Sequence, residues 1–170
     1  DQLLWWSPME RGVLRPGGLK VSRSLRRSMR DFTITIDTDF EAVIRACADP
    51  SRLGSWIDDN IRAAYIRLHR LGWAHSIETR DATGRLVGGL YGLSLGGLFA
   101  GESMFHHERD ASKAALVGLV NVLSELGEGW LIDTQWQTPH LATLGVETMP
   151  RMDYLEQIAG LEWLQSPFSA

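Results

Sequence analysis

The sequence has 170 residues, of which 44% are hydrophobic, and a formal net charge of −4, values typical of a globular domain that buries its own core. Its single cysteine, Cys47, excludes an internal disulfide framework and is typical of a reducing compartment. Because residues 1–8 lack the basic start and long apolar run of a secretory signal, we expect a cytoplasmic protein.

Positive charge is concentrated at the start of the chain. Residues 1–30 contain seven basic residues against two acidic ones, although the whole chain is acidic. The basic residues are Arg11, Arg15, Lys20, Arg23, Arg26, Arg27 and Arg30. Such a strip favours a polyanionic partner, because clustered Lys and Arg release the counterions of phosphates. The alternative is a solvated basic face without a partner.

The first predicted elements are a strand and a helix. Residues 32–37 alternate apolar and polar side chains, which is the period of a strand with one buried face. Thr38 and Glu41 then form a capping box before an amphipathic helix. Cys47 falls on the apolar face of that helix and is therefore predicted to be a core thiol.

A second helix is predicted over residues 57–71, with Ser55 as its cap and Trp56 at its start. Residues 73–79 read as the next strand, and a turn follows at residues 81–84.

Residues 86–101 form an uncharged run that ends at Glu102. The run contains six glycines and is shorter than the roughly 20 apolar residues of a membrane helix. Aromatic and branched residues on both sides of residues 94–97 predict two buried strands joined by a glycine turn. Glu102 is expected where the second strand leaves the core, so the hairpin presents an apolar pocket beside one acid.

Helices are predicted at residues 111–126, 138–145 and 151–164, with a strand at residues 130–135. Three consecutive strands in the middle of the order favour an α/β (α+β) fold with a mixed, largely antiparallel sheet flanked by helices. The acetyltransferase fold that uses coenzyme A has the same kind of arrangement, although an analogy of fold does not establish function.

Asp133 and Gln135 are the main candidates for chemistry. Because side chains alternate along a strand, the acid and the amide are expected on one face. A carboxylate can orient an amine or accept its proton, and an amide can polarise a carbonyl, without a covalent intermediate. The alternative is a polar sheet end with satisfied hydrogen bonds.

Signals for metals and cofactors are weak. His106, His107 and Glu108 are adjacent, and neighbouring residues seldom bind one ion. The other histidines are scattered along the sequence and are predicted to be surface or hydrogen-bonded side chains. Residues 85–90 resemble half of the acetyltransferase phosphate loop, but Leu90 breaks the pattern in a strand context. We therefore expect no metal and no cofactor.

Nine short motifs occur in order along the chain. They are Trp5-Trp6-Ser7-Pro8, Val21-Ser22-Arg23-Ser24, Ser55-Trp56-Ile57, His75-Ser76-Ile77-Glu78, Leu86-Val87-Gly88-Gly89-Leu90-Tyr91-Gly92, Gly101-Glu102-Ser103-Met104-Phe105, Ala111-Ser112-Lys113, Leu131-Ile132-Asp133-x-Gln135 and Leu144-Gly145. Together they resemble the bacterial leucyl/phenylalanyl-tRNA–protein transferases. The resemblance extends from Trp5 to about residue 155, and the glycine-rich motif is the most specific.

This resemblance implies that leucine or phenylalanine, and more weakly methionine, moves from aminoacyl-tRNA to the α-amine of proteins that begin with Arg or Lys. The new first residue marks those proteins for degradation by the N-degron (N-end rule) route. The resemblance also implies an acetyltransferase-like (GNAT-like) catalytic domain that uses no coenzyme A. Two alternatives stay open, a coenzyme A dependent N-acetyltransferase and a non-catalytic tRNA-binding module.

The resemblance assigns roles to residues of this sequence. Asp133 and Gln135 match the catalytic pair, in which the acid orients the attacking amine, and Glu102 matches an acid near the substrates. The aminoacyl side chain would occupy an apolar pocket of Leu90, Phe99, Leu116, Leu119, Leu123 and Ile132. The tRNA would be held by Trp56 and Trp6 at its terminal adenosine and by Arg23, Arg27 and Arg30 at its acceptor stem. The glycines of the hairpin would make room for the substrate.

Family members also carry a segment with a Gly-x-Phe-Pro-Trp-Phe motif before Trp-Trp-Ser-Pro, and this sequence does not contain it. The resemblance therefore implies an N-terminally shortened member. Residues 1–30 would be a basic remnant of the family's N-terminal domain, and residues 31–170 the catalytic domain. Trp5 or Trp6 would then replace the missing tryptophan on the second face of the adenine.

Overall fold

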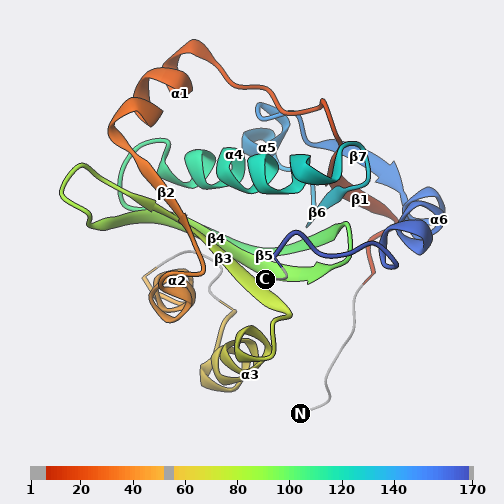
Figure 1. The fold of residues 1–170 in the computed structure, drawn as a ribbon, viewed down its shortest axis with the longest axis horizontal. Coiled ribbons are helices and arrows are strands. Elements are labelled where there is room, and N and C mark those ends of the chain that lie inside the picture. Colours follow the sequence, from red (N-terminus) through yellow and green to blue (C-terminus); the bar gives the residue numbers. More distant parts are fainter. Residues whose placement is uncertain (1–6, 52–55, 169–170) are drawn as a thin grey trace.

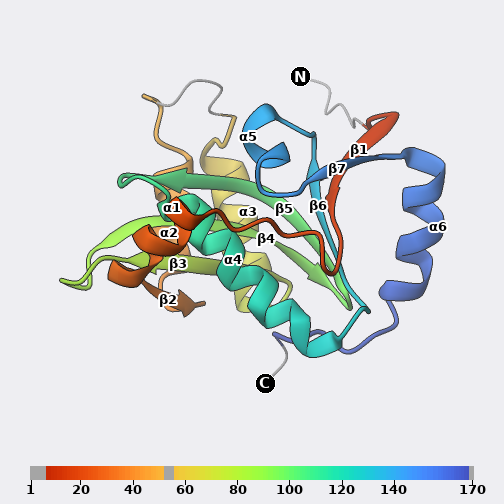
Figure 2. The ribbon, with the colours of Figure 1, turned by 90° about the horizontal axis from the view of Figure 1, so that it is seen from above.

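The computed structural model describes residues 7–51 and 56–168, which form a seven-stranded sheet with helices on both faces (Figures 1 and 2). The strands are β1 (Glu10–Leu14), β2 (Thr33–Ile36), β3 (Ala74–Arg80), β4 (Leu86–Leu95), β5 (Leu98–His106), β6 (Leu131–Gln135) and β7 (Glu147–Pro150). The helices are α1 (Arg23–Ser28), α2 (Phe40–Cys47), α3 (Asp59–Arg70), α4 (Ala111–Leu123), α5 (Pro139–Ala142) and α6 (Arg151–Leu161), with 3-10 turns η1 (Met29–Asp31) and η2 (Ser124–Leu126). None of the helices within these ranges is long and apolar enough to cross a membrane.

The sheet has the order β2-β3-β4-β5-β6-β1-β7 and is antiparallel except between β5 and β6. This arrangement confirms the predicted mixed, largely antiparallel fold class. The parallel β5–β6 ladder contains three residue pairs, from Leu98 with Leu131 to Ala100 with Asp133. The two strands are no longer paired beyond that point, and the candidate site lies there.

The helices divide between the two faces of the sheet. Figure 1 shows α4 and α1 above the sheet, α2 and α3 below it, and α6 beside β1 and β7. Helix α4 crosses the centre of its face, and ten of its 13 residues are buried. Its apolar side chains pack with Phe99, Trp130 and Ile132 in the largest core cluster. The site is therefore bordered by a rigid helix and the sheet.

Two glycines of β4 permit close packing of protein against protein. A Cβ atom at Gly88 would lie 2.6 Å from the Cβ of Ala111 at the start of α4. At Gly92 it would lie 2.6 Å from the Phe99 ring. The expectation that hairpin glycines make room for substrate is wrong at these two positions, because α4 and Phe99 occupy the space.

The helix starts also differ from the prediction. Asp39, rather than Thr38, caps α2 by accepting a hydrogen bond from the Ala42 amide at 3.3 Å. The Thr38 hydroxyl instead donates to the buried carboxylate of Glu78 at 2.9 Å. The N-cap of α3 is Asp58, and the predicted cap Ser55 lies outside the described residues.

Three elements were not predicted, namely β1, α1 and β7. Helix α1 has only six residues and is capped by Ser22, whose hydroxyl accepts from the Leu25 amide at 3.1 Å. Strand β1 pairs with β6 on one side and β7 on the other. Residues 10–14 thus belong to the same sheet as the rest of the chain, and the domain boundary at residue 30 stays a prediction.

Candidate active site

An apolar cavity of about 290 Å³ opens where β5 and β6 diverge. Five of the six residues predicted for an aminoacyl pocket line it, namely Leu90, Phe99, Leu116, Leu119 and Ile132. The sixth, Leu123, is fully buried in the same core cluster but does not line the cavity. The structure therefore gathers most of this set, from β4, β5, α4 and β6, around one space.

Several lining residues were missed by the sequence analysis. Met104, Thr138, His140 and Leu141 complete the wall on the α4 side of the strands. Met104 pairs with the cavity residue Leu90 of β4, and the irregular register between Tyr91 and Gly92 breaks the simple alternation between Glu102 and Met104, so strand periodicity alone does not place it. His140 and Leu141 belong to the four-residue helix α5. The sequence predicted a helix here, but it could not show where that helix packs, because its position depends on tertiary contacts.

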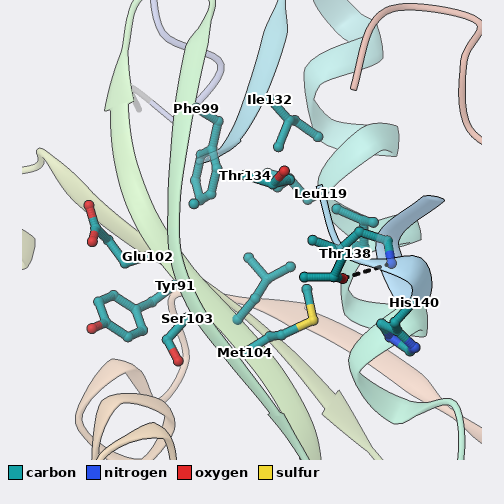
Figure 3. Close-up of a pocket in the computed structure, with 14 residues that line it drawn as sticks. Tyr91, Phe99, Glu102, Ser103, Met104, Leu119, Ile132, Thr134, Thr138 and His140 are labelled. Atoms are coloured by element: carbon teal, nitrogen blue, oxygen red, sulfur yellow. Dashed lines mark hydrogen bonds between the residues drawn. The ribbon is translucent and has the colours of Figure 1, made fainter. Parts of the chain in front are cut away.

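Glu102 lies on the opposite side of the strands from the apolar residues contributed by α4. Figure 3 shows Glu102 and Tyr91 on one side, with Leu119 and His140 on the other. Glu102 lies in the middle of β5, which is buried at Leu98 and Phe99 and only partly buried from Ala100 to Met104, so the strand becomes less buried before Glu102 but continues to His106. The acid is placed beside the opening between β5 and β6.

Burial raises the pKa of Glu102 above its ordinary value. Hydrogen bonds from Tyr65 and Gln135 act in the opposite direction and stabilise its carboxylate, whereas the negative charge of Asp133 raises its pKa further. Glu102 is therefore a partly buried acid that donors from α3 and β6 hold in place.

Asp133 is only 1% exposed, and three donors hold its carboxylate. The Arg11 guanidinium from β1 and the Tyr154 hydroxyl from α6 both donate to Oδ2, the latter at 2.8 Å. The backbone amide of Gln135 donates to Oδ1 at 2.7 Å. Arg11 also lies over the Tyr154 ring, 4.8 Å from its centroid. These contacts give the charge a fixed position.

Gln135 departs from strand geometry. Its φ of 63° lies in the left-handed region, which costs free energy for a residue with a side chain. The bond from its amide to Asp133 supports this conformation, and its side-chain Nε2 donates to the Gly101 carbonyl at 3.3 Å. The alternation of side chains along a strand therefore does not describe the relative orientation of Asp133 and Gln135, because Asp133 binds the backbone amide of Gln135.

The predicted tRNA contacts lie outside the cavity. Trp56 is 49% exposed and lies three residues before Asp59, the first residue of α3. Arg23 and Arg27 are exposed on α1, and Arg30 is exposed on the following 3-10 turn. Trp6 lies outside the described residues. Their roles stay predictions.

Two of the histidines meet near the start of α2. His75 Nδ1 lies 2.7 Å from a carboxylate oxygen of Asp37, and His69 Nδ1 lies 2.8 Å from the Ala74 carbonyl. Asp37, His69 and His75 have the spacing of a possible metal site within the described residues. Since these ring nitrogens already face protein acceptors, the prediction of hydrogen-bonded histidines is confirmed for both. Cys47 is buried, as predicted for a core thiol.

The family described as leucyl/phenylalanyl-tRNA protein transferase matches residues 13–159. A leucyl/phenylalanyl-tRNA–protein transferase of Aromatoleum aromaticum is 52% identical over 161 residues, which are 92% of this chain and 67% of that protein. One from Xanthomonas euvesicatoria is 49% identical over 162 residues, which are 92% of this chain and 64% of that protein. The chain thus spans about two thirds of the length of these relatives.

The structure is also similar to a conserved protein of unknown function from Staphylococcus epidermidis. The TM-score is 0.53 at 12% identity, and the match covers 83% of this chain and 57% of that one. At this identity the likeness concerns the fold alone. The family match and the two curated relatives place the sequence more narrowly: the chain belongs to the leucyl/phenylalanyl-tRNA–protein transferase family.

Proposed function

We propose that this chain moves leucine or phenylalanine from aminoacyl-tRNA to the α-amine of proteins that begin with arginine or lysine, which marks those proteins for degradation. Family membership supports the reaction class. The structural observation that carries the proposal is the apolar cavity directly beside a polar cluster of Glu102, Asp133 and Gln135. The two features match the two halves of the reaction, which are selection of a side chain and attack by an amine.

The cavity takes the aminoacyl side chain. Leu90, Leu116 and Leu119 present an apolar lining that suits leucine or phenylalanine. An apolar pocket distinguishes side chains by only about 1–3 kcal/mol per methylene, so methionine is a weaker substrate. The flexible side chain of Met104 lies in the same wall and adapts the lining to side chains of different shape.

The polar cluster performs the transfer. The amine nitrogen attacks the ester carbonyl, a C–N bond forms, and the ester C–O bond breaks as the proton lost by the amine passes to the departing ribose oxygen, which leaves as a hydroxyl group. Glu102 orients the attacking amine, and the Gln135 amide polarises the carbonyl. Asp133 acts through Gln135, since its own oxygens are occupied by Arg11, Tyr154 and the Gln135 backbone.

The tRNA binds through stacking and charge. Trp56 offers an exposed indole to the terminal adenine, a contact worth about 1–3 kcal/mol. Trp6 serves the same base, and Arg23, Arg27 and Arg30 meet phosphates of the acceptor stem. These assignments are based on the exposure and charge of the described side chains together with the family resemblance.

Labelled leucyl-tRNA and a peptide that begins with arginine provide the test. We expect labelled peptide, a large loss with Asp133→Ala, and no product with a peptide that begins with an acetylated residue. A chain that binds leucyl-tRNA but yields no labelled peptide contradicts the proposal. Acetylation of the same peptide from acetyl-coenzyme A would instead support the acetyltransferase alternative.

A further inference from the structure

A polar pocket of about 510 Å³ lies at the N-terminal end of α4, between α1, the end of β5 and α5. Arg109 and Lys113 line it together with Ser24, His106 and His140. None of the steps described above uses the two cations. Lys113 also ends the Ala111-Ser112-Lys113 motif, to which no role has been assigned.

The charges in this pocket do not cancel. Lys113 Nζ lies 3.3 Å and Arg109 Nε 3.9 Å from the carboxylate of Asp110, so two cations share one anion. Burial acts to raise the pKa of Asp110, but the hydrogen bond from Ser28 and the two cations outweigh it and lower that pKa. The carboxylate is therefore ionised, and one positive charge is left over.

The pocket continues the positive surface of α1. The Ser28 hydroxyl donates to Asp110 at 2.8 Å and fixes α1 against the start of α4, where both ribbon views place it (Figures 1 and 2). In the described part of the chain, Arg23, Arg27 and Arg30 form no ion pair with a carboxylate. Their charge is thus available to a polyanion that also reaches the pocket.

His140 joins the pocket to the site of chemistry, because it lines both this pocket and the apolar cavity. Burial lowers the pKa of His140, and the positive charges of Lys113 and His106 lower it further. A neutral ring therefore separates the cationic pocket from the cavity. An anion in the pocket would lie next to the ester of an aminoacyl group in the cavity.

We propose that this pocket binds a backbone phosphate in the 3′ strand of the tRNA, close to the aminoacylated nucleotide. The assignment rests on the proposed function, because the ester on the terminal ribose places the neighbouring phosphates beside the cavity. Arg109 and Lys113 bind the phosphate, and the arginines of α1 bind the strand further from the ester. The strand thereby reaches the cavity along the start of α4.

Two single variants, Arg109→Gln and Lys113→Gln, test this assignment. The Arg109 side chain is 85% exposed, so its replacement preserves the fold, and Lys113→Arg retains the charge. Arg67→Gln is the matched control, because Arg67 is an exposed arginine of α3 on the opposite face of the sheet. Binding of deacylated tRNA is measured by fluorescence anisotropy over a series of salt concentrations.

We expect each Gln variant to lower the slope of log K against log salt by about one, the loss of one phosphate contact. The KM for leucyl-tRNA should rise several-fold with kcat unchanged, and transfer from leucyl-adenosine, which has no phosphate, should be unaffected. Lys113→Arg should restore the slope, and Arg67→Gln should leave it unchanged.

The assignment is wrong if both Gln variants keep the wild-type slope of log K against log salt. It is also wrong if Arg67→Gln lowers that slope as much as they do. Binding of inorganic phosphate distinguishes a site for a small free anion from a site for tRNA. If the Gln variants weaken the binding of inorganic phosphate but not the binding of tRNA, the assignment is wrong. Because deacylated tRNA undergoes no transfer, these outcomes do not depend on the reaction. A wild type that binds tRNA with the expected slope yet transfers no leucine contradicts the proposed function alone.

Discussion

The Tyr154 hydroxyl donates to Asp133 Oδ2 at 2.8 Å and joins the helix α6 to the strand that carries the candidate catalytic pair. The same oxygen accepts from Arg11, while the other oxygen holds the backbone of Gln135. Burial raises the pKa of Tyr154 most, and Asp133 raises it further, whereas the positive charge of Arg11 acts to lower it. The geometry of Gln135 therefore depends on residues at both ends of the chain.

Replacing Tyr154 by Phe removes one donor to a buried carboxylate and keeps the ring under Arg11. We expect kcat for peptide transfer to fall about tenfold with little change in KM, because Gln135 loses part of its support. Unfolding in urea should show a loss of about 1–3 kcal/mol. Leu155→Ala, at an exposed position of the same helix, is the control. An unchanged kcat with lowered stability would show that Tyr154 serves the fold alone.

The raised pKa of Glu102 predicts two opposite effects of pH. If the ionised carboxylate orients the amine, the transfer rate falls as pH decreases through the raised pKa. Stability changes the other way: the folded state binds the proton more tightly than the unfolded state, so stability declines as pH rises through this range. Glu102→Gln should lack both dependences.

Rate profiles and melting temperatures of wild type and Glu102→Gln between about pH 4 and 8 measure these effects. Asp153→Asn, which removes an exposed carboxyl from α6, controls for the change in net charge. Parallel pH profiles of wild type and Glu102→Gln would exclude Glu102 as the titrating group.

Replacing Leu119 by Phe narrows the cavity. We expect kcat/KM for phenylalanyl-tRNA to fall by about tenfold or more relative to leucyl-tRNA, because a pocket that lacks room for the larger side chain loses about 1–3 kcal/mol. Competition between the two aminoacyl-tRNAs gives the ratio directly. Leu123→Phe is the matched control, since Leu123 is buried in the same cluster but does not line the cavity. Equal ratios in the two variants would contradict the proposed pocket.

Gly88→Ala tests the close approach of β4 and α4. The added Cβ would lie 2.6 Å from the Cβ of Ala111 and 2.7 Å from its carbonyl carbon, so the helix must move. We expect a loss of about 1–3 kcal/mol in the free energy of unfolding. Gly160→Ala in α6, with nothing within 4 Å of the new Cβ, should stabilise the protein by about 0.5–1 kcal/mol. A Gly88→Ala protein as stable as wild type would show that the packing adjusts freely.

The sequence by itself determined the elements whose signals are local. The uncharged run of β4 and β5 on both sides of a glycine turn and the apolar face of α4 predicted these elements, because such signals appear within a few consecutive residues. Five of the six pocket residues implied by the family resemblance line the cavity, although other residues complete its wall. Strands β1 and β7 were missed because each is short and acquires its partners through distant pairing, as Gly12 does with Gln135.

The tertiary structure alone decided how the polar site is built. Nothing within a few residues of Asp133 shows that Arg11 and Tyr154 hold its carboxylate, since Arg11 lies 122 positions away. The left-handed conformation of Gln135 overrides strand alternation, and β5 extends through Glu102 because its partner strand continues beside it. Local patterns specify elements, whereas the geometry of a buried charge depends on whichever donors the fold brings within hydrogen-bond distance.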